Sequence, residues 1–330
     1  MACILGVDGG NTKTIACIAT LDGHIIGSGR SGTSDIYACQ SVDAGADEIV
    51  LAVEAALAQA GQTRAEIVSG CFSLAGADWP EDYADLQNAL RARALGQTIT
   101  VYNDAIGALR AGSPDGTGVV IACGTGGAIG ARSAAGKFWH TSFWQDAMCG
   151  SELGQETLRA VRHSELGIEP PTTLTARVLE FFGVPNVEAV VRLFWLRPLN
   201  PPSHLEVSKL APLLLTEAEN GDAVAQRIVR DHGRRLAEYA LVAARKVGIE
   251  HTPFVVVLNG GVFRHPGRLL KDAVIAYMRA SSPGIHAEMS RFEPVIGALL
   301  LAFEAGGIAV TSAVQQAIES SLPAADLFST

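Results

Sequence analysis

The sequence predicts an α/β protein in which one fold occurs twice, once in each half of the chain. Three observations support this prediction. Short apolar segments alternate with segments of helical periodicity over the first hundred residues, and the same layout begins again near residue 118. The chain also has 330 residues, enough for two domains with substantial cores.

The first half begins with three expected strands joined by tight turns, CILGV, TIACIAT and HIIGSG. Residues 42–61 carry apolar side chains at helical spacing and end at Gly61, a residue typical of a helix C-cap. Next come a buried strand in EIVSGCFSLAG, a helix over 79–95, a strand in TITVYND and a short helix over 105–112. This order is typical of an α/β domain of about 110 residues.

The second half repeats the opening layout in GVVIACGTGGAIGARSAAGKFWH: strand, glycine turn, strand, turn and strand. Residues from about 150 to 250 are expected to be mostly helical, with proline-rich breaks. A buried strand in FVVVLNGG and helices over 265–280 and 293–306 come next. The last twenty or so residues suggest a peripheral helix and a loose tail.

The composition narrows the possible partners and the compartment. A net charge of −9 without any block of Lys and Arg argues against nucleic acid as a partner. No apolar stretch reaches the roughly 18 residues that a membrane span needs, and the N-terminus lacks the basic segment of a signal peptide. We therefore expect a cytoplasmic protein with six reduced, buried cysteines, and scattered histidines, His140 among them, in surface or capping roles.

Three glycine-rich loops follow three apolar strands, in GVDGGNTKT, IACGTGGAIG and VVVLNGGVF. None matches the P-loop pattern, and none is a convincing dinucleotide fingerprint, because two of the three continue into another strand. Glycine turns between strands can still bind phosphate through consecutive backbone N–H groups. The first loop taken alone favours an ordinary β-hairpin. The three together predict two hairpins that hold a nucleotide's phosphates and a third loop beneath its adenosine.

These loops make the chain resemble the superfamily of acetate kinase, sugar kinases, actin and heat-shock chaperones. Within it, residues 3–306 are most similar to the BadF/BadG/BcrA/BcrD-type ATPase family and its N-acetylglucosamine kinase-like branch. The resemblance implies two actin-like (ribonuclease H-like) ATPase domains with a duplicated βββαβαβα core and a cleft between them. It also divides the chain into three parts. Residues 1–112 form the acceptor-sugar domain, which contains the first phosphate loop. Residues 113–306 form a second domain with the second phosphate loop, the adenosine loop and a helical insertion at about 150–250, and residues 307–330 form a C-terminal helix and tail.

The resemblance also assigns ATP and Mg²⁺ to particular residues. Asp8 would orient Mg²⁺, and the contacts to ATP would come from Gly9, Gly10, Asn11, Thr12, Lys13, Gly124, Thr125, Gly126, Gly260 and Gly261. Asn11 stands where the family usually has glycine, a mild departure because Asn tolerates positive φ better than most residues.

Asp104 in VYNDAIGAL is the candidate general base. Phosphoryl transfer to a sugar hydroxyl needs a base that accepts the hydroxyl proton, and a carboxylate at a strand end before a helix can serve. The resemblance places the family's catalytic aspartate at this position. The alternative is that Asp104 caps the helix that follows it, which Asp does well.

The acceptor site is expected in GRSGTSDIY, SLAGAD and WQDAMCG, which align with sugar-contact loops of the family. The residues implied are Asp35, Ala75, Gly76, Asp104, Thr125, Gln145 and Asp146. Asp35 stands where the family usually carries Asn, and Ala147 stands where its G-D-E-G-S-G segment has Glu. These departures leave the identity of the sugar open, and an Asx-turn is the alternative role for Asp35.

Together these features predict an ATP-dependent kinase that transfers the γ-phosphate of ATP to a hydroxyl of an amino sugar. N-acetylglucosamine is the expected acceptor, with glucosamine, N-acetylmuramic acid and other sugars or polyols as alternatives. A less favoured alternative is an ATPase that activates a partner enzyme, but the chain lacks the cysteine pattern of that branch of the family. The protein is expected to act on a small sugar as a homodimer.

Overall fold

The computed structural model describes the chain except for residues 147–148, 196–200 and 329–330. The chain folds into two compact units. The first comprises Met1–Val120, Gly130–Ser142 and Ser290–Thr330, and the second comprises Ile121–Ile129 and Phe143–Met289. This division differs from the predicted domains, because residues 113–120, 130–142 and 290–330 belong to the first unit.

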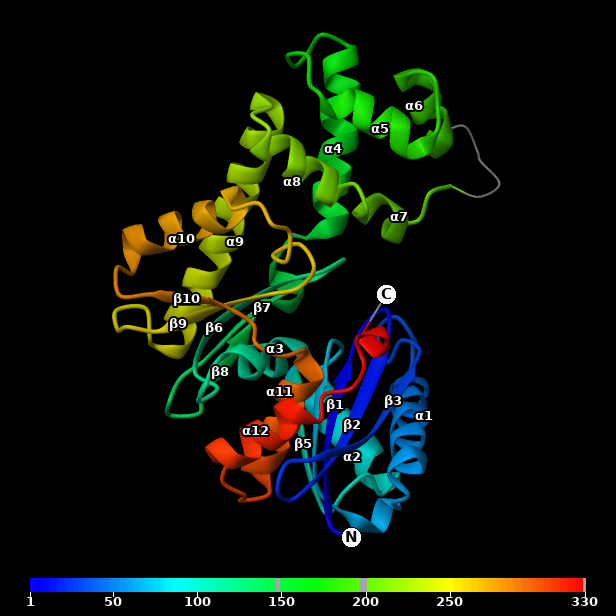
Figure 1. Cartoon of the computed structure of the whole chain (residues 1–330), viewed down its shortest axis with the longest axis vertical. Coiled ribbons are helices and arrows are strands. Elements are labelled where there is room, and N and C mark those ends of the chain that lie inside the picture. Colours follow the sequence, from blue (N-terminus) through cyan, green and yellow to red (C-terminus); the bar gives the residue numbers. More distant parts are fainter. Residues whose placement is uncertain (147–148, 196–200, 329–330) are drawn as a thin grey trace. The chain divides into compact units, whose positions relative to one another are not determined.

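The first sheet has five strands in the order β3-β2-β1-β4-β5 (Figure 1). Its strands are β1 (Cys3–Gly9), β2 (Thr14–Thr20), β3 (Ile25–Ser31), β4 (Ile67–Leu74) and β5 (Thr98–Asn103). β1, β2 and β3 form an antiparallel meander, whereas β4 pairs in parallel with both β1 and β5. The helices that follow β3, β4 and β5 are α1 (Val42–Ala60), α2 (Pro80–Ala92) and α3 (Asp104–Gly112).

The ends of α1 illustrate how local sequence sets the limits of a helix. The Ser41 hydroxyl accepts a hydrogen bond from the Ala44 N–H and so caps the first turn. At the other end Gly61 adopts a φ of 63°, and its N–H bonds to carbonyls of the last turn. This left-handed conformation favours glycine, and the predicted C-cap is confirmed.

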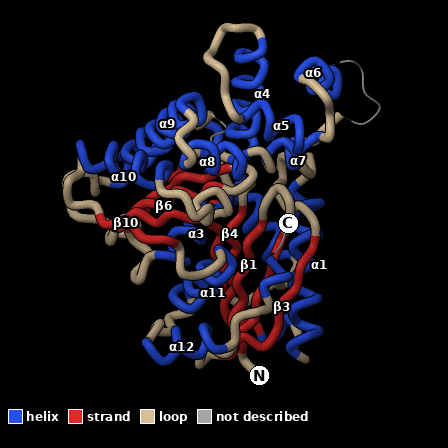
Figure 2. Tube along the Cα trace, turned by 45° about the horizontal axis from the view of Figure 1, so that its top comes forward, coloured by secondary structure: helices blue, strands red, loops and turns tan. Residues whose placement is uncertain are grey.

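Both faces of the first sheet are buried. Side chains of β1 alternate between the faces, so Leu5 packs with α1 and α2, while Ile4 packs with α11 (Pro294–Ala305). Figure 2 shows α1 and α11 on opposite sides of these strands. Gly6 faces α11 at close range, because a Cβ at this position would lie 2.6 Å from the Leu299 Cα. A helix from the end of the chain therefore completes the core of the first sheet.

The second sheet repeats the topology of the first, as the predicted duplication requires. Its strands are β6 (Gly118–Cys123), β7 (Gly127–Arg132), β8 (Phe138–His140), β9 (Val255–Asn259) and β10 (His286–Met289). Their order is β10-β9-β6-β7-β8, so the strands again appear in the order fifth, fourth, first, second, third across the sheet. The strand β10 was not predicted, because its four residues are partly or fully exposed and form no apolar run.

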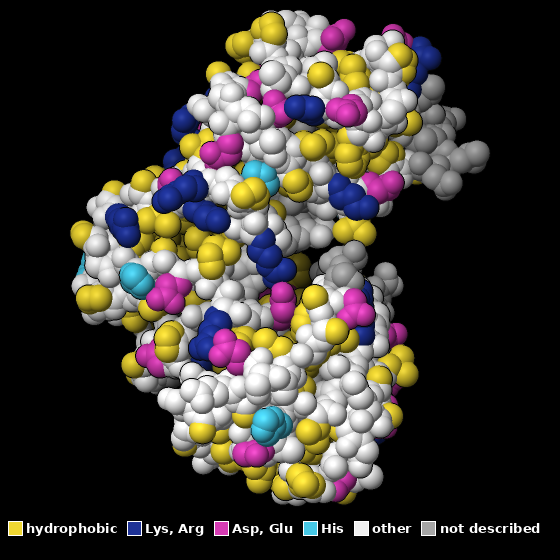
Figure 3. Space-filling view, in the orientation of Figure 1, with side chains coloured by type: hydrophobic (Ala, Val, Ile, Leu, Met, Phe, Trp, Pro, Cys, Tyr) yellow, Lys and Arg dark blue, Asp and Glu magenta, His cyan; other side chains and the backbone are white. Residues whose placement is uncertain are grey.

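The predicted helical region between residues 150 and 250 is confirmed. It contains α4 (Gly150–Glu165), α5 (Leu174–Phe182), α6 (Val187–Trp195), α7 (His204–Ser208), α8 (Ala211–Glu219) and α9 (Ala223–Val247), and α10 (Leu269–Ser281) lies between β9 and β10. No helix in the described part of the chain has the length and apolarity that a membrane crossing requires. On the face drawn in Figure 3, Lys and Arg side chains lie among Asp and Glu side chains.

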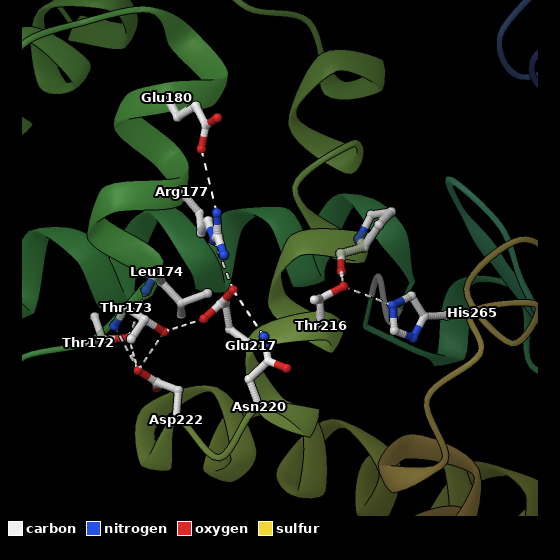
Figure 4. A network of polar contacts seen from close by, with 11 residues as sticks. Thr172, Thr173, Leu174, Arg177, Glu180, Thr216, Glu217, Asn220, Asp222 and His265 are labelled. Carbon is white, nitrogen blue, oxygen red and sulfur yellow. Dashed lines mark hydrogen bonds and ion pairs between the residues drawn. The ribbon is translucent and has the colours of Figure 1, made fainter.

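A polar network joins α5, α8 and α9 (Figure 4). Glu217 of α8 is 4% exposed, and its carboxylate accepts hydrogen bonds from Thr173 Oγ1 at 2.6 Å and Arg177 Nε at 2.9 Å. Asp222 is the N-cap of α9 and accepts hydrogen bonds from the N–H groups of Ala225 and Thr173. The two carboxylates thus hold the start of α5 against the α8–α9 corner.

The C-terminal segment is more ordered than the loose tail that the sequence suggested. The expected peripheral helix is α12 (Ser312–Ser320), which buries Ile318. Residues Ala325–Phe328 form a 3-10 turn, and two carbonyls of this turn accept hydrogen bonds from side chains near the N-terminus. Lys13 Nζ donates to the Phe328 oxygen, and Arg30 Nη1 donates to the Leu327 oxygen at 3.2 Å.

Candidate active site

The first glycine loop forms a β-hairpin, as its sequence favours when taken alone. Gly9 pairs with Thr14 at the end of the β1–β2 ladder, and the Gly10 N–H donates to the Lys13 carbonyl at 3.0 Å. Asn11 and Thr12 form the exposed tip. Asn11 does not adopt a positive φ, so its tolerance for that conformation is not needed. An exposed tip between two strands leaves backbone N–H groups open to an anion.

Two further loops lie against this hairpin. The Gly9 carbonyl accepts a hydrogen bond from the Ala75 N–H at 2.8 Å, and the Gly10 carbonyl accepts one from the Ser34 N–H at 3.2 Å. A Cβ on Gly9 would lie 2.6 Å from Leu74 Cδ2, so a larger residue here would require the buried side chains of Leu74 and Ser34 to move. The hairpin therefore brings the predicted phosphate loop next to the predicted acceptor loops. The Ala75 N–H is used in this contact and is not open to a substrate.

Asp35 is 7% exposed, and one of its oxygens serves a turn. Its Oδ1 accepts a hydrogen bond from the Tyr37 N–H at 2.9 Å, which is the Asx-turn that the sequence offered as an alternative. The same oxygen would lie 3.0 Å from a Cβ on Gly76, so the two predicted acceptor residues are neighbours. The turn role does not exclude a ligand role, because a carboxylate has two oxygens.

Asp104 is not the N-cap of α3. The cap is Asn103, whose side-chain oxygen accepts a hydrogen bond from the Ala105 N–H at 3.1 Å. Asp104 is the first helical residue, and its side chain is not needed for capping. Burial raises the pKa of the Asp104 carboxyl to about 7, and the negative charges of Asp8 and Asp78 add to the rise. A carboxyl with a pKa near neutrality has the proton affinity of a general base.

Asp8 stands at the end of β1 beside the hairpin. Burial raises the pKa of its carboxyl to about 7, opposed by the charge of Lys13 and supported by that of Glu293. No hydrogen bond from the described residues reaches this carboxylate. Over the described ranges, no group of three or more His, Cys, Asp or Glu side chains could hold a metal ion. A Mg²⁺ ion bound with a nucleotide needs only one or two protein carboxylates, so the donor set fits.

Asp78 is a member of this acidic group that the sequence did not single out. Its Oδ1 accepts hydrogen bonds from Ser142 Oγ at 2.6 Å and from Asn103 Nδ2 at 3.0 Å. Burial raises the pKa of Asp78 to about 6, against the effect of the Ser142 hydrogen bond. The residue ends the SLAGAD segment, which was aligned only through its backbone, and its partner Ser142 is 64 residues away. No local pattern in the sequence points to that contact.

The second glycine loop lies at the start of α4, within the second unit. The Gly124 carbonyl accepts a hydrogen bond from the Gly150 N–H at 2.9 Å, and the Thr125 carbonyl accepts one from the Ser151 N–H at 3.0 Å. Gly126 is exposed, and a Cβ there would meet nothing within 4 Å. The carbonyls of the loop thus face the helix, and the tip of the loop is open.

The third glycine loop packs directly on the second. Gly260 has a φ of 96°, and a Cβ on it would lie 2.9 Å from the Cys123 nitrogen. The Val262 N–H donates to the Cys123 carbonyl at 3.1 Å. Because Cys123 precedes Gly124, the predicted adenosine and second phosphate loops lie side by side. Gly261 has open space around it.

The remaining predicted acceptor residues lie in the segment that follows β8. Gln145 Nε2 donates to the Gly127 carbonyl at 2.6 Å, which ties this segment to the second glycine loop. Asp146 is exposed. The departure at Ala147 lies outside the described residues.

Comparisons with known proteins identify the family of the chain. Residues 5–302 match the model of the BadF/BadG/BcrA/BcrD ATPase family. The chain is 25% identical over 312 residues to an N-acetyl-D-glucosamine kinase of Dictyostelium discoideum, with 90% of this chain and 97% of the relative covered. It is 23% identical over 308 residues to an N-acetylmuramic acid/N-acetylglucosamine kinase of Clostridium acetobutylicum, with 92% and 98% covered.

Two solved structures share the fold. One comes from Chromobacterium violaceum and carries a provisional assignment as an N-acetylglucosamine kinase, with a TM-score of 0.66, 23% identity, and 92% of this chain and 99% of that chain covered. The other is a ROK family glucokinase from Streptomyces griseus with glucose and AMPPNP, with a TM-score of 0.55, 19% identity, and 92% and 100% covered. The predicted duplicated actin-like fold is confirmed. The protein belongs to the BadF/BadG/BcrA/BcrD ATPase family.

Proposed function

We propose that the protein is an ATP-dependent kinase that transfers the γ-phosphate of ATP to a hydroxyl of an amino sugar, with N-acetylglucosamine as the principal acceptor. The observation that carries this proposal is Asp104. Its carboxyl is partly buried, is not the cap of α3, and lies in the same unit as Asp8, Asp35 and Asp78. The family and the names of the relatives given above support the same reaction class.

In the proposed reaction Asp104 accepts the proton of the attacking sugar hydroxyl. A carboxylate whose pKa is raised to about 7 binds that proton more strongly than an exposed aspartate would, yet it is about half ionised at neutral pH and becomes largely ionised as the pH rises above that value. The position of Asp104 at the first turn of α3 fixes the carboxylate on a rigid element. A fixed base can hold the hydroxyl in line with the γ-phosphate, which supplies much of the catalysis in phosphoryl transfer.

The proposed contacts to ATP come from all three glycine loops. Backbone groups at Gly9–Lys13 and Gly124–Gly126 would bind the phosphates, and Gly260 and Gly261 would border the adenosine. Asp8 would hold Mg²⁺, which would supply charge neutralisation on the phosphates. Lys13 bonds to the Phe328 carbonyl in this structure, so binding of the phosphates by Lys13 requires the release of that contact.

The proposed acceptor site centres on Asp35, Gly76 and Asp104, with Ala75, Thr125, Gln145 and Asp146 as further candidates. Asp35 brings a negative charge to a position where the family usually has a neutral amide. A carboxylate there would favour glucosamine, which carries an ammonium group, more than an amide would. Glucosamine is therefore the second candidate acceptor, and N-acetylmuramic acid, named for one relative, is the third. On the family resemblance we also propose a cytoplasmic homodimer.

The test is an acceptor panel. Purified protein with Mg²⁺ and ATP is incubated with N-acetylglucosamine, glucosamine, N-acetylmuramic acid and glucose, and ADP release is measured alongside ³¹P NMR of the products. A sugar phosphate formed in equal amount to ADP is the expected result. ADP release without any phosphorylated sugar would instead support an ATPase and would contradict the proposal. Size-exclusion chromatography with light scattering tests the dimer.

A further inference from the structure

We propose that Asp78 is a second carboxylate that binds the acceptor sugar. Its Oδ2 accepts a hydrogen bond from a hydroxyl or ammonium group of the sugar. Its Oδ1 is held in place by a series of hydrogen bonds that begins at Tyr83 and whose donors all point towards Asp78. This inference rests on the proposed function, because it assigns a specificity-determining residue to the same site. All residues of this hydrogen-bond series belong to the first unit.

The series runs through four side chains in contact. Tyr83 Oη lies 2.8 Å from His140 Nε2, and His140 Nδ1 lies 2.5 Å from Ser142 Oγ. Ser142 Oγ lies 2.6 Å from Asp78 Oδ1. His140 is 9% exposed, so the expectation of a surface or capping histidine is wrong. The residue is buried because it joins α2, through Tyr83, to the loop after β8.

The direction of each hydrogen bond follows from the last residue of the series, Asp78, whose carboxylate can only accept. Ser142 donates its one proton to Asp78, so its oxygen must accept from His140 Nδ1–H. Burial lowers the pKa of His140 to about 4, so the ring is neutral near pH 7 and carries a single N–H. His140 Nε2 is then an acceptor, and the Tyr83 hydroxyl donates to it. Every proton in the series points towards Asp78, and Asn103 Nδ2 adds one more donor at 3.0 Å.

The fold itself does not need the second oxygen of Asp78. The N–H groups at the start of α2 are satisfied by Asp82, whose Oδ2 accepts from the N–H groups of Asp78 at 3.2 Å and Trp79 at 2.8 Å. Asp78 is therefore not a helix cap. No hydrogen bond from the described residues reaches its Oδ2, and the residue is partly exposed. An anchored carboxylate with one open oxygen is the arrangement that fixes a substrate hydroxyl.

Two more observations place this oxygen among the acceptor residues. The charges of Asp78 and Asp35 both act on the Asp104 carboxyl, so the three groups lie close enough to repel one another. A ligand that donates hydrogen bonds relieves that repulsion. Ser142 also adopts a φ of 40°, a left-handed conformation that residues with a Cβ rarely adopt. Such strain is concentrated at functional sites, where the surrounding contacts hold it.

The test combines acceptor analogues with variants at Asp78. Monodeoxy analogues of the accepted sugar are compared in the wild type, in Asp78→Asn, which keeps the shape, and in Asp78→Ala, which removes the carboxylate. For the wild type, one analogue should lose ~10- to 100-fold in kcat/KM, as expected for a hydrogen bond to a charged group. That loss should shrink to below about 3-fold in Asp78→Ala and take an intermediate value in Asp78→Asn, while the KM for ATP changes by less than about 2-fold.

Ser142→Ala tests the series itself. We expect the loss for the same analogue to shrink by about 3- to 10-fold, because Asp78 keeps its charge but loses one anchor. The matched control is Ser113→Ala in the same unit, which removes a serine hydroxyl that lies 3.0 Å from Asp115 Oδ1 and 2.7 Å from the Thr117 carbonyl, beyond the other end of α3. This control should leave the ranking of the analogues unchanged. Thermal unfolding of each variant reports any loss of folded protein.

The possible outcomes separate the two proposals. A wild type that phosphorylates no sugar would refute the proposed function and this inference together. The wild type could instead be an active sugar kinase while the Asp78 variants lower kcat/KM by the same factor for every analogue. That result would refute only the inference, because a purely structural residue affects all analogues alike. Selective loss at one sugar position supports both.

Discussion

The close contact between α3 and α11 links the stability of the first unit to the position of Asp104. Gly297 of α11 faces the backbone of α3, and a Cβ added to it would lie 2.7 Å from the Ala111 nitrogen. The Gly107 carbonyl oxygen would be nearer still. Ordinary contacts of a Cβ begin at 3.4 Å, and the Gly107 oxygen is the nearest obstacle, so Gly297→Ala requires the two helices to separate by about 1.5 Å.

The sign of the effect on stability is set by two opposing contributions. Alanine favours a helix interior over glycine by about 1 kcal/mol. Overpacking of a tight interface costs about 1–3 kcal/mol, and the upper end applies because the obstacle is the backbone of α3, which cannot rotate away. We therefore expect Gly297→Ala to lower the free energy of unfolding by about 1–2 kcal/mol, on balance.

The same substitution should reduce catalysis, because α3 begins at Asp104. A shift of about 1 Å in a catalytic group can lower the rate by about 10²-fold, so a shift of this size should lower kcat by about 10²-fold. Urea unfolding and steady-state kinetics measure the two effects. The control is Ala305→Ser, an exposed position on the same helix, which should stay within about 0.5 kcal/mol and keep full activity. An unchanged urea midpoint together with an unchanged kcat in Gly297→Ala would refute the reasoning.

The remaining predictions concern individual carboxylates. Asp104→Asn should lower sugar phosphorylation by ~10²–10⁴-fold with ATP binding nearly intact in calorimetry, and full turnover would exclude Asp104 as the base. Since burial raises the pKa of Asp104 to about 7 and the base must be ionised, kcat/KM for the sugar should fall as pH drops through that value, whereas a flat profile from pH 6 to 8 would contradict this role. Asp35→Asn should change the ratio of activities on glucosamine and N-acetylglucosamine more than it changes ATP affinity, and a constant ratio would leave Asp35 with only its turn. The hydrogen bond from Thr173, assisted by Arg177, holds the pKa of Glu217 below 4.5 in the folded protein despite burial. The ionised carboxylate therefore adds folding stability above pH ~4.5, and this stability is lost as the pH falls through the lower pKa of the folded state. Glu217→Gln should therefore flatten the loss of unfolding free energy between about pH 5 and pH 3, as measured by urea titration at each pH.

Much of the fold could be predicted because its signals are local. Gly61 ends α1 in the conformation that its sequence position suggests, and the repeated strand and turn order predicted two sheets of equal topology. The strand β10 was missed because its partly exposed residues gain their order from pairing with β9, a contact that no local pattern reveals. The ordered turn at Ala325–Phe328 likewise depends on Lys13, at the other end of the chain.

The candidate site shows the same division between local and distant signals. The glycine loops and Asp104 could be found from the sequence, but whether Asn103 or Asp104 caps α3 could not, because both residues cap helices well. In the structure Asn103 is the cap. Asp78 could not be recognised because its donors, Asn103 and Ser142, are distant in sequence and carry no motif of their own.

The packing of α11 on the first sheet has a consequence for synthesis on the ribosome. The strands β1 and β2 emerge first, but the helix that covers one of their faces is made only after residue 294. Until then Ile4, Cys17 and Ala19 present an apolar surface that nothing local can cover. Completion of the amino-terminal unit must wait for the carboxyl-terminal residues, and a nascent chain stalled before them would leave this surface exposed to aggregation.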